Sequence, residues 1–506
     1  MKLIRYTAML LAAAIAASAQ SPTGRWVAKA SSDDEVREIV VALNVSPEGA
    51  ISGYIQAPQY EDRIVEGTAK DGKLAFVGER DANNNTKQKR NYNAVLEVGK
   101  LKLTMPSRGN QPPQVMEFTR LSSEAPKPLP PAPPKISAAA YTPVKYNGLA
   151  KTPPMGWNSW NKFRGKVNDQ VVREIADAMV SSGMKDAGYL YVNIDDTWES
   201  TRDERGNIRS NSKFPDMKKL ADYVHGKGLK LGIYSSPGPK TCAGYEGSFQ
   251  HETQDAKTYA AWGIDYLKYD WCSAARVYEA SAMPAAYAKM GAALLDSGRD
   301  IVYSLCQYGL ENVGEWGAKA GGNLWRTTGD ISDRWQSLEN IGFKQQIGRE
   351  KFAAPGHWND PDMLEIGNGG MTDAEYRTHM ALWSILAAPL LAGNDLRDIK
   401  PSILQILTNK EVIAVDRDAL GKQGVRASQE DTVEVWVRTL ADGAYAAGLF
   451  NRGDATAKVT AKWSDLGISG SHAVRDLWEH ADRGKFTDAF SADVPSHGVV
   501  FVRIAK

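Results

Sequence analysis

The 506-residue sequence is poor in cysteine and histidine, and this scarcity excludes two kinds of architecture. Its three cysteines are too few to staple a chain of this length into a disulfide scaffold. The seven histidines are scattered, and none lies at ligand spacing from a cysteine, so a zinc site is not expected. The simplest pairing of three cysteines is one disulfide bridge and one unpaired thiol.

The sequence also lacks an excess of either charge. Its 61 Lys and Arg residues nearly balance its 60 Asp and Glu residues, and no basic stripe runs along the chain. We therefore expect no nucleic-acid partner. No GxGxxG motif or P-loop follows a predicted strand, which argues against a nucleotide-binding sheet.

Long apolar runs are missing after the N-terminus, so we expect no membrane span in the mature chain. The N-terminus carries Lys2 and Arg5, then the apolar stretch TAMLLAAAIAA, then a small-x-small pattern at 17–19. This order is typical of a signal peptide, with a buried helix as the alternative. We expect residues 1–19 to be removed and the mature protein to be exported to the periplasm or the extracellular space.

The chain is too long for one hydrophobic core, and its N-terminal part has a pattern of its own. Short alternating segments separated by turn signals predict an all-β domain over 20–122, as a small antiparallel barrel or sandwich. A proline-rich stretch follows and predicts an extended linker over 123–147. Aromatic residues of this domain are more often core residues than a sugar-stacking surface, although both remain open: Trp26, Tyr54, Tyr60 and Tyr92.

The region 148–419 alternates short apolar runs with helical segments. Eight such strand-plus-helix units predict an α/β fold of the (β/α)8 TIM-barrel type, with a doubly wound open sheet as the alternative. The runs are TPPMGWN, GYLYVNIDD, LKLGIYSS, IDYLKYD, DIVYSLCQ, NLWRTTGD, GHWNDPDM and LLAGNDL. From 420 to 506 only strand patterns remain, which predicts a C-terminal antiparallel β-sandwich.

Carboxylates, cations and tryptophans gather where the predicted barrel strands end. Catalytic groups of such barrels come from these C-terminal strand ends. A single aspartate there is more often a helix N-cap, but five strand ends equipped in this way exceed what capping requires. The residues are Trp157 and Trp160, Asp195 and Asp196, Lys268 and Asp270, Arg326 and Asp330, and Asp360 and Asp362.

This set of residues suits a sugar better than a metal ion. Several carboxylates could hold a divalent cation, but Lys268 and Arg326 would compete with it. Hydroxyl groups fit carboxylates and lysine, and tryptophan covers the C–H face of a sugar. Glycoside hydrolysis needs two carboxyl groups in different protonation states. Lys268 is expected to keep Asp270 ionised as the nucleophile, while burial or a neighbouring charge keeps the other acid protonated.

At these positions the sequence resembles glycoside hydrolase family 27, the family of α-galactosidases and α-N-acetylgalactosaminidases. The matching stretches cover nearly all of 148–420 in order. They are TPPMGWNSWNKF (152–163), VNIDDTW (192–198), KFPDMKKLADYVHGKGLKLGIYSSPGPKTCAGYEGS (213–248), GIDYLKYDWC (263–272), YSLCQYG (303–309), WRTTGDI (325–331), GHWNDPDMLEIGNGGMT (356–372) and ALWSILAAPLLAGNDLR (381–397).

The resemblance implies a retaining exo-α-galactosidase that forms a covalent glycosyl-aspartate and needs neither metal nor organic cofactor. It makes Asp270 the nucleophile and Asp330 the general acid/base, and it implies a disulfide between Cys242 and Cys272. Its partners would be galactose-containing oligosaccharides, polysaccharides or glycoconjugates. The implied substrate-binding residues are Trp160, Asp195, Asp196, Tyr234, Lys268, Cys306, Gln307, Arg326, Asp362 and Met363.

Within the resemblance, two positions bear on the choice of sugar. Gln307 and Leu310 are expected to leave little room for an N-acetyl group, and the intact Asp195-Asp196 pair is expected to leave room for the exocyclic CH2OH of galactose. The alternatives are a β-L-arabinopyranosidase and an α-N-acetylgalactosaminidase. A catalytically inactive sugar-binding protein would lack one of the two acids, and both are present.

Overall fold

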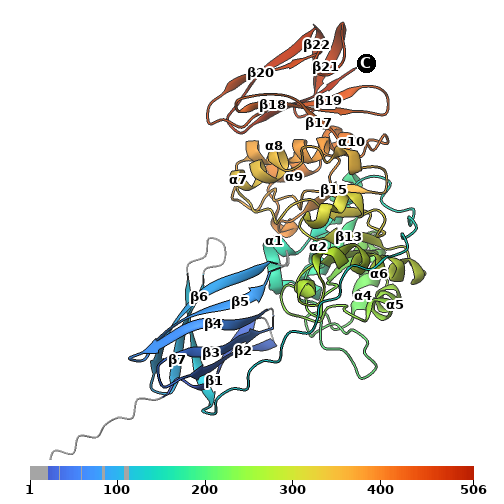
Figure 1. Cartoon of the computed structure of the whole chain (residues 1–506). Coiled ribbons are helices and arrows are strands. Elements are labelled where there is room, and N and C mark those ends of the chain that lie inside the picture. The colour runs from blue at the N-terminus through green and yellow to red at the C-terminus, as the bar shows by residue number, and fades with distance from the viewer. Residues whose placement is uncertain (1–20, 33–34, 59, 83–85, 107–112, 506) are drawn as a thin grey trace, which may run out of the picture. The chain divides into compact units, whose positions relative to one another are not determined.

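The computed structural model describes residues 21–32, 35–58, 60–82, 86–106 and 113–505, and the predicted signal peptide lies outside them. The chain forms two compact units that divide near Pro131 (Figure 1). Among the described residues, no helix has the length and apolar character needed to cross a membrane.

The N-terminal unit is a closed barrel of eight antiparallel strands that follow one another in chain order. Alternation alone left a barrel and a sandwich open, and the pairing of the first strand with the last decides for the barrel. The strands are β1 (Gly24–Ser32), β2 (Glu35–Val45), β3 (Ile51–Ala57), β4 (Tyr60–Lys70), β5 (Lys73–Asp81), β6 (Lys87–Glu97), β7 (Lys100–Met105) and β8 (Gln114–Ser122).

Three of the four aromatic residues singled out in this unit belong to its hydrophobic core. Trp26, Tyr60 and Tyr92 are almost fully buried, whereas Tyr54 is half-buried. The interpretation as core residues is therefore confirmed for these three.

A buried carboxylate, Asp62, lies inside this barrel. Arg80 donates from Nη2 to Asp62 Oδ2 at 2.6 Å and from Nε to Oδ1, and the Tyr92 hydroxyl donates to Oδ2. The guanidinium carbon also lies 3.7 Å from the ring centre of Tyr60. Burial and the Asp62 carboxylate raise the pKa of Tyr92 above its ordinary value, so Tyr92 remains a donor.

The second unit contains a sheet of eight parallel strands in the order of a (β/α)8 barrel, so the predicted fold is confirmed and the open-sheet alternative is wrong. Each predicted apolar run contains one strand. These are β9 (Met155–Asn158), β10 (Tyr191–Asn193), β11 (Lys230–Ser235), β12 (Tyr266–Asp270), β13 (Val302–Cys306), β14 (Leu324–Arg326), β15 (Trp358–Asp360) and β16 (Leu390–Ala392).

The seam between β15 and β16 is joined by a single bridge instead of a ladder. The chain leaves the sheet after Asp360, and Leu364 then bridges to Ala392. The Leu364 amide donates to the carbonyl of Leu391 at 2.8 Å, and the Gly393 amide donates to the carbonyl of Leu364 at 3.0 Å.

Helices cover the sheet and follow the expected apolar periodicity. In α2 (Asp169–Ser181), the Asn168 side chain caps the N-terminus by accepting a hydrogen bond from the Val171 amide, and buried residues recur at helical spacing. The α-helices are α1 (Trp160–Phe163), α2 (Asp169–Ser181), α3 (Met184–Ala187), α4 (Met217–Gly226), α5 (Glu252–Trp262), α6 (Met283–Asp296), α7 (Trp335–Leu338), α8 (Asp373–Ile385), α9 (Pro401–Leu407) and α10 (Lys410–Asp416). Short 3-10 or π segments are η1 (Arg164–Lys166), η2 (Ser273–Arg276), η3 (Ala280–Ala282), η4 (Leu310–Glu315), η5 (Glu339–Lys344), η6 (Glu350–Phe352) and η7 (Leu396–Asp398).

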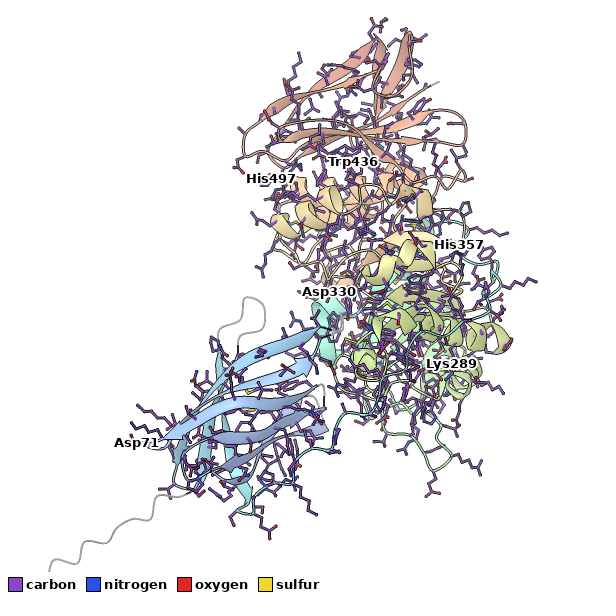
Figure 2. All side chains as sticks on the ribbon, viewed as in Figure 1. Asp71, Lys289, Asp330, His357, Trp436 and His497 are labelled. Atoms are coloured by element: carbon purple, nitrogen blue, oxygen red, sulfur yellow. A yellow bond between two sulfur atoms is a disulfide. The ribbon has the colours of Figure 1, made fainter. Side chains whose placement is uncertain are left out.

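Two antiparallel sheets follow the barrel, as predicted, and the six-stranded one packs on α8 (Figure 1). His497 stacks on Trp335 with ring centres 4.1 Å apart and lies 2.7 Å from Glu375 Oε1, while Arg438 donates to the Ser384 carbonyl at 2.7 Å. Figure 2 labels His497 and Trp436 beside this boundary. The strands are β17 (Val425–Glu430), β18 (Val433–Thr439), β19 (Tyr445–Asn451), β20 (Ala457–Lys462), β21 (Ser471–Asp476), β22 (Ala481–Thr487), β23 (Ala489–Val494) and β24 (Val499–Ile504).

Candidate active site

A cavity of about 760 Å³ opens where the parallel strands end at their carboxyl termini. This is the end of a (β/α)8 barrel at which functional loops gather. Most of the residues predicted for the site line this one cavity: Trp160, Asp195, Asp196, Tyr234, Lys268, Asp270, Arg326, Asp330, Asp362 and Met363, together with Cys242.

Asp270, the last residue of β12, is only 6% exposed. Among the described residues, both hydrogen bonds to its carboxylate come from tyrosine hydroxyls. Tyr308 donates to Oδ1 at 2.6 Å, and Tyr234 donates to Oδ2 at 3.2 Å. Burial raises the pKa of Asp270 from 3.8 to about 6, although the charge of Lys268 and the bond from Tyr308 lower it. The carboxylate is therefore poised to ionise near neutral pH.

Lys268 acts on Asp270 through space. Its ammonium group donates to Asp195 Oδ2 at 2.8 Å, and the Asn158 side-chain amide donates to the same oxygen at 2.9 Å. The expectation that Lys268 favours ionisation of Asp270 holds in direction, since its charge lowers that pKa. Burial outweighs this effect, so Lys268 alone does not keep the carboxylate ionised.

Asp196 is held by the backbone of two loops. The Ala243 amide donates to its Oδ2 and the Thr197 amide to its Oδ1, both at 2.7 Å. Burial, reinforced by the charge of Asp195, raises the pKa of Asp196 to about 7. A carboxyl group with this pKa can accept or donate a hydrogen bond to a sugar hydroxyl near neutral pH.

The predicted disulfide between Cys242 and Cys272 is confirmed. It joins the loop that carries Ala243 to the end of β12, directly after Asp270. The two sulfurs and an Asp270 carboxylate oxygen lie within 4.8 Å of one another, which is a spacing that metal ligands adopt. Because both sulfurs are covalently paired, they are not available as thiolate ligands.

Asp330 follows β14 and lies in a different environment from Asp270. Its side chain is 70% exposed (Figure 2), and the buried guanidinium of Arg326 donates to its Oδ1 at 3.1 Å. Burial, one of the two causes considered for holding a proton on the second acid, therefore does not apply to Asp330. The charge of Asp330 in turn raises the pKa of Asp270, so the two carboxyl groups interact.

Arg326 also pairs with Asp362, with Nη2 2.9 Å from Oδ2. The Ile331 amide donates to Asp362 Oδ2 and the Met363 amide donates to Oδ1. Asp362 has φ of 96°, which is uncommon for a residue with a side chain. These contacts hold the strained turn and present Met363 to the cavity, whereas burial raises the pKa of Asp362.

Two of the substrate-binding residues implied by the resemblance, Cys306 and Gln307, are not among the described residues that line the cavity, and neither are Trp157 and Asp360 of the predicted strand ends. Cys306 is an unpaired, buried thiol whose pKa is raised by burial. Gln307 is fully buried, and its Nε2 donates to the Arg326 carbonyl at 3.1 Å. Tyr308 lines the cavity in place of Cys306 and Gln307. This residue, which donates to the nucleophile candidate Asp270, was not predicted from the sequence.

A polar wall opposite these residues was also missed. Asn161 Nδ2 donates to Glu365 Oε1 at 2.5 Å, and Asn368 Nδ2 donates to Glu365 Oε2 at 2.6 Å. Burial raises the pKa of Glu365 to about 7. Asp333 lines the same side and accepts from the Tyr376 hydroxyl at 3.0 Å. The side of the cavity beyond Asp330 therefore offers mostly hydrogen-bonding groups.

The arrangement suits acid/base and nucleophilic chemistry at one bond. A buried carboxylate and an exposed carboxyl group line one cavity, so they meet the requirement for two acids in different environments. Tryptophan and a ring of polar side chains complete a surface that fits a polyhydroxylated ring.

Comparisons with known proteins agree with this geometry. A family described as alpha galactosidase A matches residues 152–418, and the alpha galactosidase C-terminal beta sandwich domain matches residues 430–504. An α-galactosidase of Cyamopsis tetragonoloba is 49% identical over 69% of this chain and 85% of its own.

Solved structures extend the comparison. The structure of α-galactosidase I from Mortierella vinacea is 38% identical, with a TM-score of 0.68, and covers 71% of this chain and 98% of its own. A structure from Bacteroides fragilis is 31% identical with the same TM-score and covers 96% of this chain and 92% of its own. The similarity to the Bacteroides fragilis structure therefore extends beyond the residues that the two families match and includes the N-terminal part of the chain.

Proposed function

Because the chain belongs to glycoside hydrolase family 27, whose α-galactosidases it matches at 49% identity, we propose that it releases terminal α-D-galactosyl residues by double displacement. Its class of activity is that of an α-galactosidase, and its substrates are α-galactosides. The observation that carries the mechanism is the difference in environment between Asp270 and Asp330 on one cavity.

In the first step, Asp270 attacks the anomeric carbon and forms a glycosyl-aspartate. The bond to the leaving oxygen breaks, and the proton of Asp330 passes to that oxygen. Solvent reaches Asp330, so a water molecule can approach it for the second step. Arg326, which is 3.1 Å from Asp330, orients the acid toward the leaving group.

In the second step, Asp330 accepts a proton from water as the water oxygen attacks the anomeric carbon. The bond to Asp270 breaks, the free carboxylate returns, and the sugar leaves with its original anomeric configuration. Asp196, Lys268 and Asp362 bind hydroxyl groups of the galactosyl ring, while Trp160 covers a C–H face of it.

Galactose is the proposed sugar, with arabinopyranose and N-acetylgalactosamine as the alternatives to be tested. The Asp195-Asp196 pair, held by Asn158, Lys268 and backbone amides, supports galactose. Gln307 does not line the cavity, so this residue does not directly limit the room for an N-acetyl group. Its neighbour Tyr308 occupies that part of the wall instead. We expect hydrolysis of aryl α-galactosides to exceed that of β-L-arabinopyranosides and α-GalNAc glycosides in a direct kcat/KM comparison.

We further propose that the protein is exported and acts on galactose-containing oligosaccharides, polysaccharides or glycoconjugates. The Cys242–Cys272 disulfide supports an oxidising location. Comparing the N-terminal sequence of the purified secreted protein with the predicted cleavage site before Gln20 tests export.

The decisive test is the variant Asp270→Asn, assayed with an aryl α-galactoside. We expect kcat to fall by roughly 10⁴-fold or more, because the amide cannot form the glycosyl-enzyme. The matched control is Asp482→Asn, at an 82% exposed side chain of the C-terminal sheets, which should retain wild-type kcat. Activity of Asp270→Asn above a tenth of wild type would exclude this nucleophile, and release of β-galactose as the first NMR-visible anomer would exclude double displacement.

A further inference from the structure

The loop after β13 places an aromatic residue in a backbone conformation that it rarely adopts. Tyr308 has φ of 60° and the next residue, Gly309, has φ of 76°. A Cβ on Gly309 would lie 2.2 Å from the Thr327 carbonyl oxygen, so this turn requires glycine. Bulky residues with positive φ are uncommon, and such strain is often retained where it positions a functional group.

The strained turn carries the Tyr308 hydroxyl to the Asp270 carboxylate. Cys306, the last residue of β13, is the register partner of Asp270 in the parallel ladder. Tyr308 comes two residues after Cys306 and therefore lies close to Asp270. Its hydroxyl donates to Asp270 Oδ1 at 2.6 Å and lies 3.4 Å from Cys242 Sγ. Burial raises the pKa of Tyr308 well above its ordinary value, so the phenol keeps its proton.

The two oxygens of Asp270 are held unequally. Tyr308 is 2.6 Å from Oδ1, whereas Tyr234 is 3.2 Å from Oδ2 and shares its hydroxyl with Cys272 Sγ at 3.0 Å. A short bond to an ionised acceptor is the stronger one. Oδ1 is therefore the anchored oxygen, and Oδ2 is the one that is freer to attack.

We propose that Tyr308 is a catalytic hydrogen-bond donor to the nucleophile, and that it acts mainly in the second step, on Asp270 as the leaving group. This inference rests on the proposed function, in which Asp270 Oδ2 bonds to the anomeric carbon. During the second step that C–O bond breaks, its electron pair returns to the carboxylate, and negative charge grows on both oxygens. A donor already aimed at Oδ1 stabilises this charge without reorganisation. Tyr308 keeps its proton throughout, and Asp330 takes the proton of the attacking water.

In the first step the hydrogen bond from Tyr308 has the opposite effect on the rate. There the carboxylate loses charge as it attacks, so the bond from Tyr308 weakens toward the transition state and gives no acceleration. Loss of the hydroxyl should therefore slow release of the sugar from Asp270 more than its capture. The glycosyl-enzyme then accumulates, which lowers kcat and KM together with an activated substrate.

The pH profile provides a second signature. Ionisable groups that interact with the Asp270 carboxylate come from the ends of five neighbouring strands and from α6, and they are Asp195, Tyr234, Lys268, Tyr287, Cys306, Tyr308 and Asp330. Among these, the bond from Tyr308 lowers the pKa of Asp270. Removing it should move the acidic limb of kcat/KM, which reports the free enzyme, to higher pH.

The test is Tyr308→Phe, which removes one oxygen and keeps the ring. With an activated aryl α-galactoside we expect kcat to fall about 10- to 100-fold, the range for a lost bond to a charged acceptor. KM should fall in parallel, and kcat/KM above pH 7 should change only a few-fold. A burst of aryl alcohol equal to the enzyme concentration should appear. The matched control is Tyr303→Phe, on the preceding strand β13, whose buried hydroxyl donates to the Tyr287 carbonyl at 3.0 Å and which should show no burst.

Galactose binding and the unfolding temperature of Tyr308→Phe establish that the pocket is intact. Wild-type kcat and pH profile, or an equal loss of kcat and kcat/KM with neither a burst nor a shifted limb, would overturn the role of Tyr308. Activity surviving in Asp270→Asn would instead overturn the proposed nucleophile. The two failures are therefore distinguishable.

Discussion

Asp62 in the N-terminal barrel and Asp270 in the second unit are both buried carboxylates that accept hydrogen bonds from tyrosine, but they differ in their cations. Asp62 receives two bonds from Arg80 in addition to that from Tyr92. At Asp270 the nearby Lys268 donates to Asp195 instead. The first carboxylate has its charge matched by direct contact, whereas the second has not.

This difference separates a carboxylate that stabilises the fold from one that is available for chemistry. Three hydrogen bonds occupy most of the acceptor sites of Asp62, and removing its cationic partner leaves an uncompensated buried charge. Asp270 retains an oxygen with only a 3.2 Å bond and borders an open cavity. Its environment costs stability when it ionises, as is common for functional sites.

The largest expected effect on stability is at Arg80. Arg80→Met leaves Asp62 buried without its cation, so the free energy of unfolding of the N-terminal barrel should fall by about 3–5 kcal/mol. Calorimetry of the full chain measures the loss, and kcat should remain that of wild type. Lys102→Met, at an exposed ion pair with Glu97, is the control. An unchanged transition would show that the Arg80–Asp62 pair does not stabilise the barrel.

The next effect has the opposite sign and depends on pH. The pKa of Asp270 is raised in the folded state from 3.8 to about 6, so the stability that its protonated form contributes is present below pH 3.8 and is lost as pH rises through 6. Asp270→Asn resembles the protonated form at every pH. We expect the variant to be more stable than wild type by about 3 kcal/mol above pH 6, with the difference vanishing near pH 4. Unfolding curves at pH 4, 5, 6 and 7 measure it, and a constant difference would contradict the assignment.

A smaller effect compares the two tyrosine donors. Tyr92→Phe removes a hydrogen bond to the paired carboxylate and should cost the barrel about 2 kcal/mol without altering kcat. Tyr308→Phe should do the reverse, with a clear loss of kcat and little change in the unfolding temperature. Measured side by side, equal stability losses in the two variants would remove the distinction between them.

The smallest effect is expected at an exposed carboxylate. Glu117 pairs with Lys100 at 2.6 Å on the surface of the N-terminal barrel, and both side chains are nearly half exposed. Solvent screens such pairs, so Glu117→Gln should leave the unfolding temperature unchanged within error in 0.15 M salt. A loss comparable to that of Arg80→Met would mean that burial is not what separates strong pairs from weak ones.

Much of the fold could be predicted because the strands of a parallel barrel are buried and end in polar residues. Each of the eight predicted runs contains one strand, and most of the predicted residues at their ends, including Asp195, Asp270 and Arg326, line one cavity. Strand ends are set by local composition, and the barrel then brings them together. Alternation in the N-terminal region does not encode which strands pair, so closure into a barrel became visible only from the pairing itself.

The missed residues depend on tertiary geometry. Tyr308 reaches Asp270 only because its backbone is in the left-handed region, and no periodic pattern predicts that conformation at a tyrosine. Asp62 shares the inner face of β4 with Tyr60, two residues earlier, but no local pattern identifies Arg80 of the next strand as its partner. Burial or a neighbouring charge was expected to keep the second acid protonated, and burial is ruled out for Asp330, whose exposed side chain lies beyond the end of β14.

The single bridge between β15 and β16 has a consequence for how this scaffold can diversify. Residues 361–363 are fastened at both ends, by Asp360 in the sheet and by the Leu364–Ala392 bridge. Lengthening that segment would displace the hydrogen bonds that hold Asp362 and Met363, so insertions there should be poorly tolerated. The loop between β13 and β14 also joins two paired strands, but it is much longer, so an insertion beyond the Tyr308–Gly309 turn can be accommodated without moving either strand. Laboratory evolution toward new leaving groups or sugars should therefore accumulate insertions in that loop and point substitutions at Asp362 and Met363.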